Sequence, residues 1–234
     1  NTTIQLSSAN KWWGPGFRNA LILSNNAGGF PHISVSNKKL IKTSIGLFNY
    51  ELIWGQLINN GLPPQFSNFS FGGNPLYAPK EDRIRLFQAI NVQYFPKWFS
   101  NLSLGLEQSF VQYKDQLSNL ADYLPIKNII HRIPDDHLKK PIIITALYFK
   151  YQMPEVQAKI YGEFGWNLNR TTFRNWLIQP DKGLGSVLGF SKLFNSNNHY
   201  WEFLAEMSNL QLQTRAEQFS TNAEKVPTII PKPE

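Results

Sequence analysis

The strongest constraint on this chain's fold is an alternation of apolar and polar residues at every second position. It is clearest over residues 156–168, where Lys159, Tyr161 and Glu163 share one face. The opposite face carries Val156, Ala158, Ile160, Gly162, Phe164, Trp166 and Leu168. A helix needs apolar residues three and four positions apart, and this segment has no such pattern. The alternation therefore predicts a β-strand with one polar and one apolar face.

The same pattern returns along most of the chain and predicts about ten to twelve strands. The expected strands lie within 4–6, 20–23, 33–35, 40–58, 84–94, 102–107, 142–153, 156–168, 184–194 and 201–208. Several run for about 12–16 residues, longer than the usual globular strand of about 5–6. Tight turns are expected at 94–97 and 153–154. Long strands joined in this way favour an all-β, antiparallel up-and-down barrel.

The composition of the two faces indicates a transmembrane barrel. The polar face mixes Arg, Lys, Glu, Gln and Asn with Gly and Ser, as a wet lumen does. The apolar face is aliphatic in its middle and aromatic towards its ends, at positions such as Trp98, Phe99, Tyr200 and Trp201. Aromatic girdles at the two membrane interfaces produce this distribution. A soluble β-sandwich with core aromatics is the alternative.

Other classes of protein find little support. The 23 Lys and Arg residues, against 16 Asp and Glu, are scattered and form no nucleic-acid-binding arm. The chain has no cysteine, which excludes disulfides and thiolate chemistry, and we expect no cofactor. No apolar run approaches the roughly 18 residues of a transmembrane helix. The first residues do not show a charged segment followed by an apolar one, and we expect any signal peptide to have been removed or to lie upstream.

Three connections look like long barrel loops, rich in Asn, Gly, Pro and charge: 59–80, 114–140 and 169–183. A short helix is expected within 116–123. The proline-rich segment 226–234 is interpreted as a loop or linker. We expect residues 1–234 to form one incomplete barrel, truncated at both ends.

One block of sequence resembles the signature of the Wzi capsule-assembly family. It comprises Trp12-Trp13-Gly14-Pro15-Gly16-Phe17, then residues 21–27 and Phe30-Pro31. The residues that match as structural elements of the motif are Trp13, Gly14, Pro15, Gly16, Asn25 and Asn26. In the family, the Trp-Gly-Pro-Gly turn leads into a Leu-Ile-Leu strand. Weaker similarity follows at 54–57, 85–87 and 102–107.

The resemblance implies a closed barrel of roughly eighteen strands in the outer membrane of a Gram-negative bacterium. It implies a role in capsule or exopolysaccharide assembly and attachment, with lectin-like polysaccharide binding and no catalysis. The expected partners are capsular or extracellular polysaccharide and outer-membrane lipids, without nucleic acid. The expected state is a monomer with surface-exposed loops. The family's amino-terminal periplasmic helices and closing strands are not visible here.

The residues suited to holding polysaccharide combine aromatic rings with polar or charged groups on the lumen side. These candidates are Trp12, Trp13, Arg83, Arg85, Lys159 and Glu163.

Three other functions were weighed. A porin-like channel would use the same polar face and would conduct ions. An outer-membrane lipase would use His32 and Ser34, which share a strand face, with a third orienting group. Glu202 and Glu206 lie about 13 Å apart on one strand, too far for paired carboxylate catalysis, and are interpreted as lumen wall. The residues His131, Asp135, Asp136 and His137 are interpreted as a solvated loop, and no metal is expected.

Overall fold

The computed structural model describes residues 2–59, 61–62, 67–71, 74–75, 77, 82–117, 123, 142–167, 184–196 and 199–210. The expected linker 226–234 and the residues of the weighed metal loop lie outside the described residues. So does most of the helix expected within 116–123, of which only Gln116, Leu117 and Tyr123 are described. Gln116 ends a short 3₁₀ turn, η1 (Lys114–Gln116).

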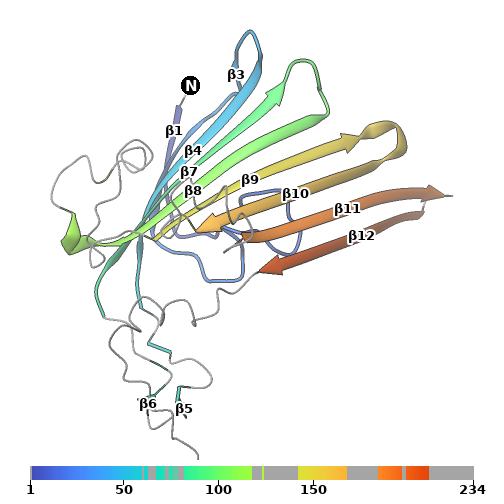
Figure 1. The fold of residues 1–234 in the computed structure, drawn as a ribbon. Coiled ribbons are helices and arrows are strands. Elements are labelled where there is room, and N and C mark those ends of the chain that lie inside the picture. The colour runs from blue at the N-terminus through green and yellow to red at the C-terminus, as the bar shows by residue number, and fades with distance from the viewer. Residues whose placement is uncertain are drawn as a thin grey trace, which may run out of the picture.

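Ten of the described strands form one antiparallel sheet (Figure 1). Its strands are β1 (Thr2–Ser7), β2 (His32–Asn37), β3 (Ile41–Lys42), β4 (Gly46–Leu57), β7 (Arg85–Pro96), β8 (Leu102–Tyr113), β9 (Ile142–Met153), β10 (Ala158–Asn167), β11 (Leu184–Ser196) and β12 (His199–Leu210). The order is β1-β2-β4-β7-β8-β9-β10-β11-β12, with β3 paired to β4. A separate pair joins β5 (Ser70–Phe71) to β6 (Asn74–Pro75). The expected all-β, up-and-down antiparallel fold is confirmed.

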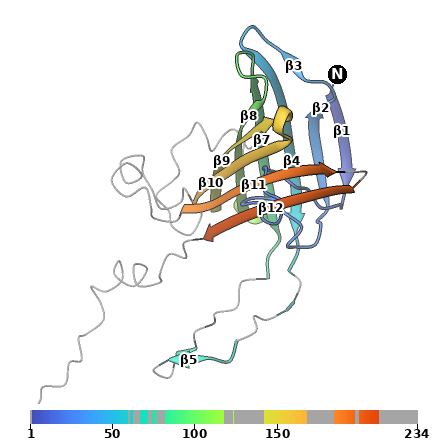
Figure 2. The same cartoon turned by 90° about the vertical axis from the view of Figure 1, so that its right-hand side faces the viewer.

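The sheet is open and strongly curved, with β1 and β12 at its edges (Figure 2). This is the form of a partial β-barrel. The strand predicted at 142–153 is β9 with the same bounds, and the long segment 40–58 divides into β3 and β4. The prediction of a strand at 20–23 is wrong. These residues lie in the connection between β1 and β2 and pair with no strand.

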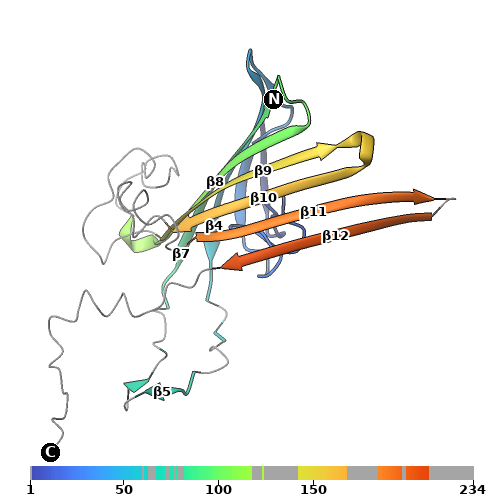
Figure 3. The same ribbon diagram turned by 45° about the vertical axis from the view of Figure 1, so that its right-hand side comes forward.

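The connections at the two ends of the sheet differ in length. At one end 97–101 joins β7 to β8, 154–157 joins β9 to β10, and 197–198 joins β11 to β12. Two of these hairpins extend to the right in Figure 3. The β9–β10 turn is η3 (Pro154–Val156), closed by Gln157 at φ 51°. The longer connections 8–31, 58–84, 114–141 and 168–183 all leave the opposite end.

The two faces of the sheet have the chemistry that the alternation predicts. On the outer face Leu104, Leu106, Leu147 and Ile160 are each more than a third exposed to solvent. The register places four glutamates on the inner, concave face: Glu51, Glu107, Glu163 and Glu206. Near the end with short turns, Trp98, Phe99, Tyr200 and Trp201 are all exposed.

Two glycines on the inner face make room for tyrosine rings from the next strand. A Cβ on Gly189 would fall 2.0 Å from the ring of Tyr161, and Gly105 has the same relation to Tyr148. The Tyr161 hydroxyl also donates to Glu206 at 2.7 Å. We expect Gly189→Ala to displace the ring, break this bond and lower the free energy of unfolding by about 1–3 kcal/mol. Urea unfolding in detergent would measure it. Gly28→Ala is the control, because a Cβ there meets nothing within 4 Å. Equal stability of the two variants would contradict the packing argument.

Candidate functional site

Residues 8–31, here called the inner segment, connect β1 to β2 and lie within the curve of the sheet (Figure 2). The segment folds back on itself, because the Trp13 amide donates to the Leu23 carbonyl at 3.1 Å. The Trp12 indole N–H closes a smaller turn by donating to the Gly16 carbonyl at 2.9 Å. The inner segment therefore has a defined conformation although it contains no strand or helix.

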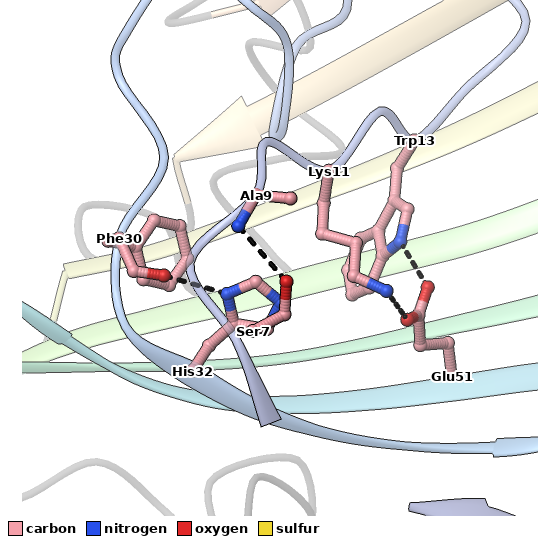
Figure 4. A network of polar contacts seen from close by, with 7 residues as sticks. All are labelled: Ser7, Ala9, Lys11, Trp13, Phe30, His32 and Glu51. Atoms are coloured by element: carbon pink, nitrogen blue, oxygen red, sulfur yellow. Dashed lines mark hydrogen bonds and ion pairs between the residues drawn. The ribbon is translucent and has the colours of Figure 1, made fainter. Parts of the chain in front are cut away.

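The first anchor of the inner segment is Glu51 on β4 (Figure 4). The Lys11 Nζ lies 2.6 Å from its Oε1, and the Trp13 indole N–H donates to its Oε2 at 2.8 Å. Both oxygens are thus engaged by neighbouring residues of one segment. Because charged hydrogen bonds are stronger than neutral ones, this pair fixes the start of the segment.

The second anchor is Glu206 on β12, at the opposite edge of the sheet. Its carboxylate accepts the successive backbone amides of Phe17, Arg18 and Asn19 at 2.6, 3.0 and 3.1 Å. Tyr161 adds its hydroxyl to the same group. Asn19 also donates through its side chain to Ser208 at 2.9 Å. A carboxylate bound by consecutive amides suits a tight turn, which points several N–H groups in one direction.

Two further glutamates, Glu107 on β8 and Glu163 on β10, lie between these anchors and are both fully buried. The Leu21 amide donates to Glu163 Oε1 at 2.9 Å, and the backbone of Gly14 hydrogen-bonds to Glu107. The Oε2 atom of each has no hydrogen-bond partner within the described part of the chain. Burying a carboxylate is costly unless donors replace water. The inner segment supplies such donors from its backbone.

At Gly14 the backbone of the inner segment lies close to the sheet. Its φ is +83°, and a Cβ there would fall 2.6 Å from Glu163 Oε2. Glycine adopts this conformation without steric cost, and its lack of a side chain leaves room for the carboxylate. Gly16 has a similar constraint, because a Cβ there would meet the Asn19 carbonyl oxygen at 1.9 Å.

The apolar residues of the inner segment complete the packing against the sheet. Trp13 and Leu23 are buried in a cluster with Ile53, Phe87 and Ala89. Partly buried Ile22, Phe30, Leu57 and Val111 pack around this cluster. Ile22 and Leu23 contact this cluster from a bent segment, and Leu21 lies against Gly165 and Gly185, so residues 21–23 are apolar without forming the expected strand.

A glutamate thus projects from every second strand between β4 and β12 towards one segment. We call Glu51, Glu107, Glu163 and Glu206 the glutamate cradle. Sequence reasoning placed Glu163 and Glu206 in the lumen wall and did not single out Glu51 or Glu107. The signal was present in the sequence, since each is a carboxylate at an inward position of a long alternating strand.

The structure distributes the predicted polysaccharide-binding residues over four places. Trp12, Trp13 and Glu163 belong to the inner segment and its cradle. Arg83 lies just before β7, where it pairs with Asp115 at 2.6 Å and lies 3.8 Å from the Tyr113 ring centroid. Lys159 lies on the inner face near the β9–β10 turn, at the other end of the sheet. The assignment of these residues to a ligand stays a prediction.

The sixth predicted residue, Arg85, borders an open cleft of about 670 Å³ at the end of the sheet with long connections. The inner segment forms one wall of the cleft and the ends of β4, β7 and β8 form the other. The Nε of Arg85 is buried and finds no hydrogen-bond acceptor among the described residues.

His32 and Ser34, the pair that a lipase mechanism would use, lie on one face of β2, as their spacing predicts. Both side chains are 2% exposed. The Nδ1 of His32 lies 2.7 Å from the Phe30 carbonyl oxygen (Figure 4). In the described ranges, no cluster of three or more His, Asp or Glu residues is arranged to bind a metal ion.

One comparison with known proteins gives a match, to a family of capsule assembly proteins. Residues 1–111 match the family described as capsule assembly protein Wzi. This range covers the inner segment and the strands from β1 to most of β8. No curated protein and no solved structure gives a significant match to the chain.

Proposed function

We propose, from the match of residues 1–111 to the Wzi capsule-assembly family, that this chain is a Wzi-like protein that retains capsular polysaccharide at the surface of the outer membrane. In this proposal the protein binds polymer and performs no catalysis. The proposal has three components: the location in the membrane, the polysaccharide ligand and the absence of catalysis. Each has its own support.

The observation that carries the proposal is the position of the inner segment. The glutamate cradle binds one part of the signature block, including Trp13 and Leu21, and another part, including Ile22, Asn26 and Phe30, lines the cleft beside Arg85. In outer-membrane barrels the short turns face the periplasm and the long connections face outward. The cleft, at the end with the long connections, would then open towards the cell surface, where capsule is held.

The membrane location is supported by the outer face. Exposed aliphatic residues cover its middle, and exposed aromatic residues lie near the end with short turns. This arrangement matches the apolar band and aromatic girdle of outer-membrane barrels. Within the described ranges, no helix has the length and apolar character needed to cross a bilayer.

The proposal of a non-catalytic role is supported by the surroundings of His32 and Ser34. A serine hydrolase needs an exposed nucleophile and a carboxylate or amide that orients the histidine. Here both residues are buried, and the histidine ring is oriented by a backbone carbonyl. The porin alternative is supported by the polar inner face, but the inner segment occupies that face. Stable conductance in planar bilayers would favour the channel.

A capsule partition experiment tests the proposed function. In a strain that lacks the gene, we expect normal polymer synthesis with most of the polymer released into the medium. Complementation with the native gene should restore cell-bound capsule, and the Lys192→Gln variant should do so equally. Lys192 suits the control because it contacts Phe194 and the Val156 carbonyl near a short turn, far from the cleft. Unchanged retention in the deletion strain would refute surface anchoring.

A further inference from the structure

The charges that line the cleft beside Arg85 limit the class of ligand that it can bind. None of the described residues lining it is acidic, and two of them are basic, Lys11 and Arg85. The Lys11 ammonium is paired with Glu51 at 2.6 Å, so its charge is already balanced. Arg85 has no ion-pair partner among the described residues, and within the same ranges its Nε has no hydrogen-bond acceptor. The electrostatic character of the cleft therefore favours an anionic ligand.

The remaining lining fits a sugar. Phe30 and Phe87 meet edge to face with ring centroids 5.2 Å apart, and both border the cleft. Aromatic rings provide apolar surface for the C–H faces of a pyranose. Asn10, Asn26 and Gln56 add amide groups that can donate to and accept from hydroxyls. An apolar floor with a few polar groups is the usual composition of a small-ligand site.

We propose that this cleft binds an acidic sugar residue of the polysaccharide, with the sugar carboxylate against the Arg85 guanidinium. The inference rests on the proposed function, because it names the class of polymer that the surface protein would hold. Guanidinium and carboxylate can form two parallel hydrogen bonds, which gives selectivity for a uronic acid over a neutral hexose.

The test uses the complete protein in detergent and two probes, oligogalacturonate and the same oligomer after reduction of its carboxyl groups. We expect the native protein to bind the acidic probe at least about tenfold more tightly, as one charged hydrogen-bond pair would provide. Arg85→Gln should remove this preference, and Arg85→Lys should keep only part of it, because lysine lacks the planar fork. Lys192→Gln should bind like the native protein.

Equal affinity of the native protein for the two probes would overturn the inference, and so would an unchanged preference in Arg85→Gln. The comparison of probes on the native protein needs no variant, so a folding defect cannot obscure it. The capsule partition experiment separates the two proposals. Release of polymer by the deletion strain, together with no preference for the acidic probe, refutes the acidic-sugar site alone. Unchanged retention of polymer by the deletion strain, with the preference intact, refutes the proposed function instead.

Discussion

Glu206→Ala should release the middle of the inner segment from the sheet while leaving the strands paired. The substitution removes the acceptor of three consecutive backbone amides and of the Tyr161 hydroxyl. Hydrogen bonds to charged groups contribute about 1.5–3 kcal/mol each, and part of this is recovered by water at a half-buried site. We expect the local opening free energy to fall by about 3 kcal/mol, which is roughly a hundredfold faster amide exchange at residues 17–19. Hydrogen exchange read by mass spectrometry measures it.

Glu202→Ala is the matched control, because Glu202 lies on the same strand and face but makes one described hydrogen bond, to Ser191 at 2.8 Å. It should leave exchange in the inner segment unchanged. Glu206→Gln should fall between the native protein and Glu206→Ala, because it retains one carbonyl oxygen as an acceptor. Native exchange rates in Glu206→Ala would show that the apolar cluster around Trp13 alone holds the segment.

Gly14→Ala should destabilise the protein through two separate effects, one on the backbone and one on the contact with Glu163. An alanine at this position would have to adopt a φ of +83°, and its Cβ would lie 2.6 Å from Oε2 of the fully buried Glu163. The backbone conformation costs about 1 kcal/mol for alanine, and the overlap costs a further 1–3 kcal/mol. We expect the free energy of unfolding to fall by about 2–4 kcal/mol, measured by urea unfolding in detergent.

A double-mutant cycle separates the two causes. The Glu163→Ala background removes the three atoms nearest to the new methyl group, so Gly14→Ala should there cost little more than the backbone contribution of about 1 kcal/mol. Gly28→Ala, in the same segment but without neighbours within 4 Å, should be nearly neutral. An equal cost for Gly14→Ala in both backgrounds would mean that the contact with Glu163 is relieved by movement of the segment.

The strands were predictable because one physical rule determines them. An inner face that differs chemically from the outer face imposes a period of two, and for this reason a strand was predicted over 156–168, where β10 spans Ala158–Asn167. The rule fails for residues 21–23, whose side chains follow the shape of a packed bend. Apolar residues in a row look the same whether they pair in a sheet or cover one.

The glutamate cradle could be predicted only in part. The alternation of residues along a strand assigns Glu163 and Glu206 to the inner face, but it does not predict which groups their carboxylates contact. Their partners are backbone amides of a segment more than a hundred positions away, and a backbone amide leaves no trace in the sequence. Only the glycine at position 14 hints at a close approach. Three-dimensional packing was needed to join the signature residues to the carboxylates.

The bond between Phe17 and Glu206 joins residues 189 positions apart and so has a consequence for assembly. The inner segment is made early in the chain, yet it cannot complete its contacts until β12 has joined the sheet. A slip of β12 by one residue would turn Glu206 to the opposite face and remove its amide partners. Closure of so large a loop is entropically slow, so docking comes late. The inner segment can therefore dock completely only after every intervening strand has joined the sheet in its correct register.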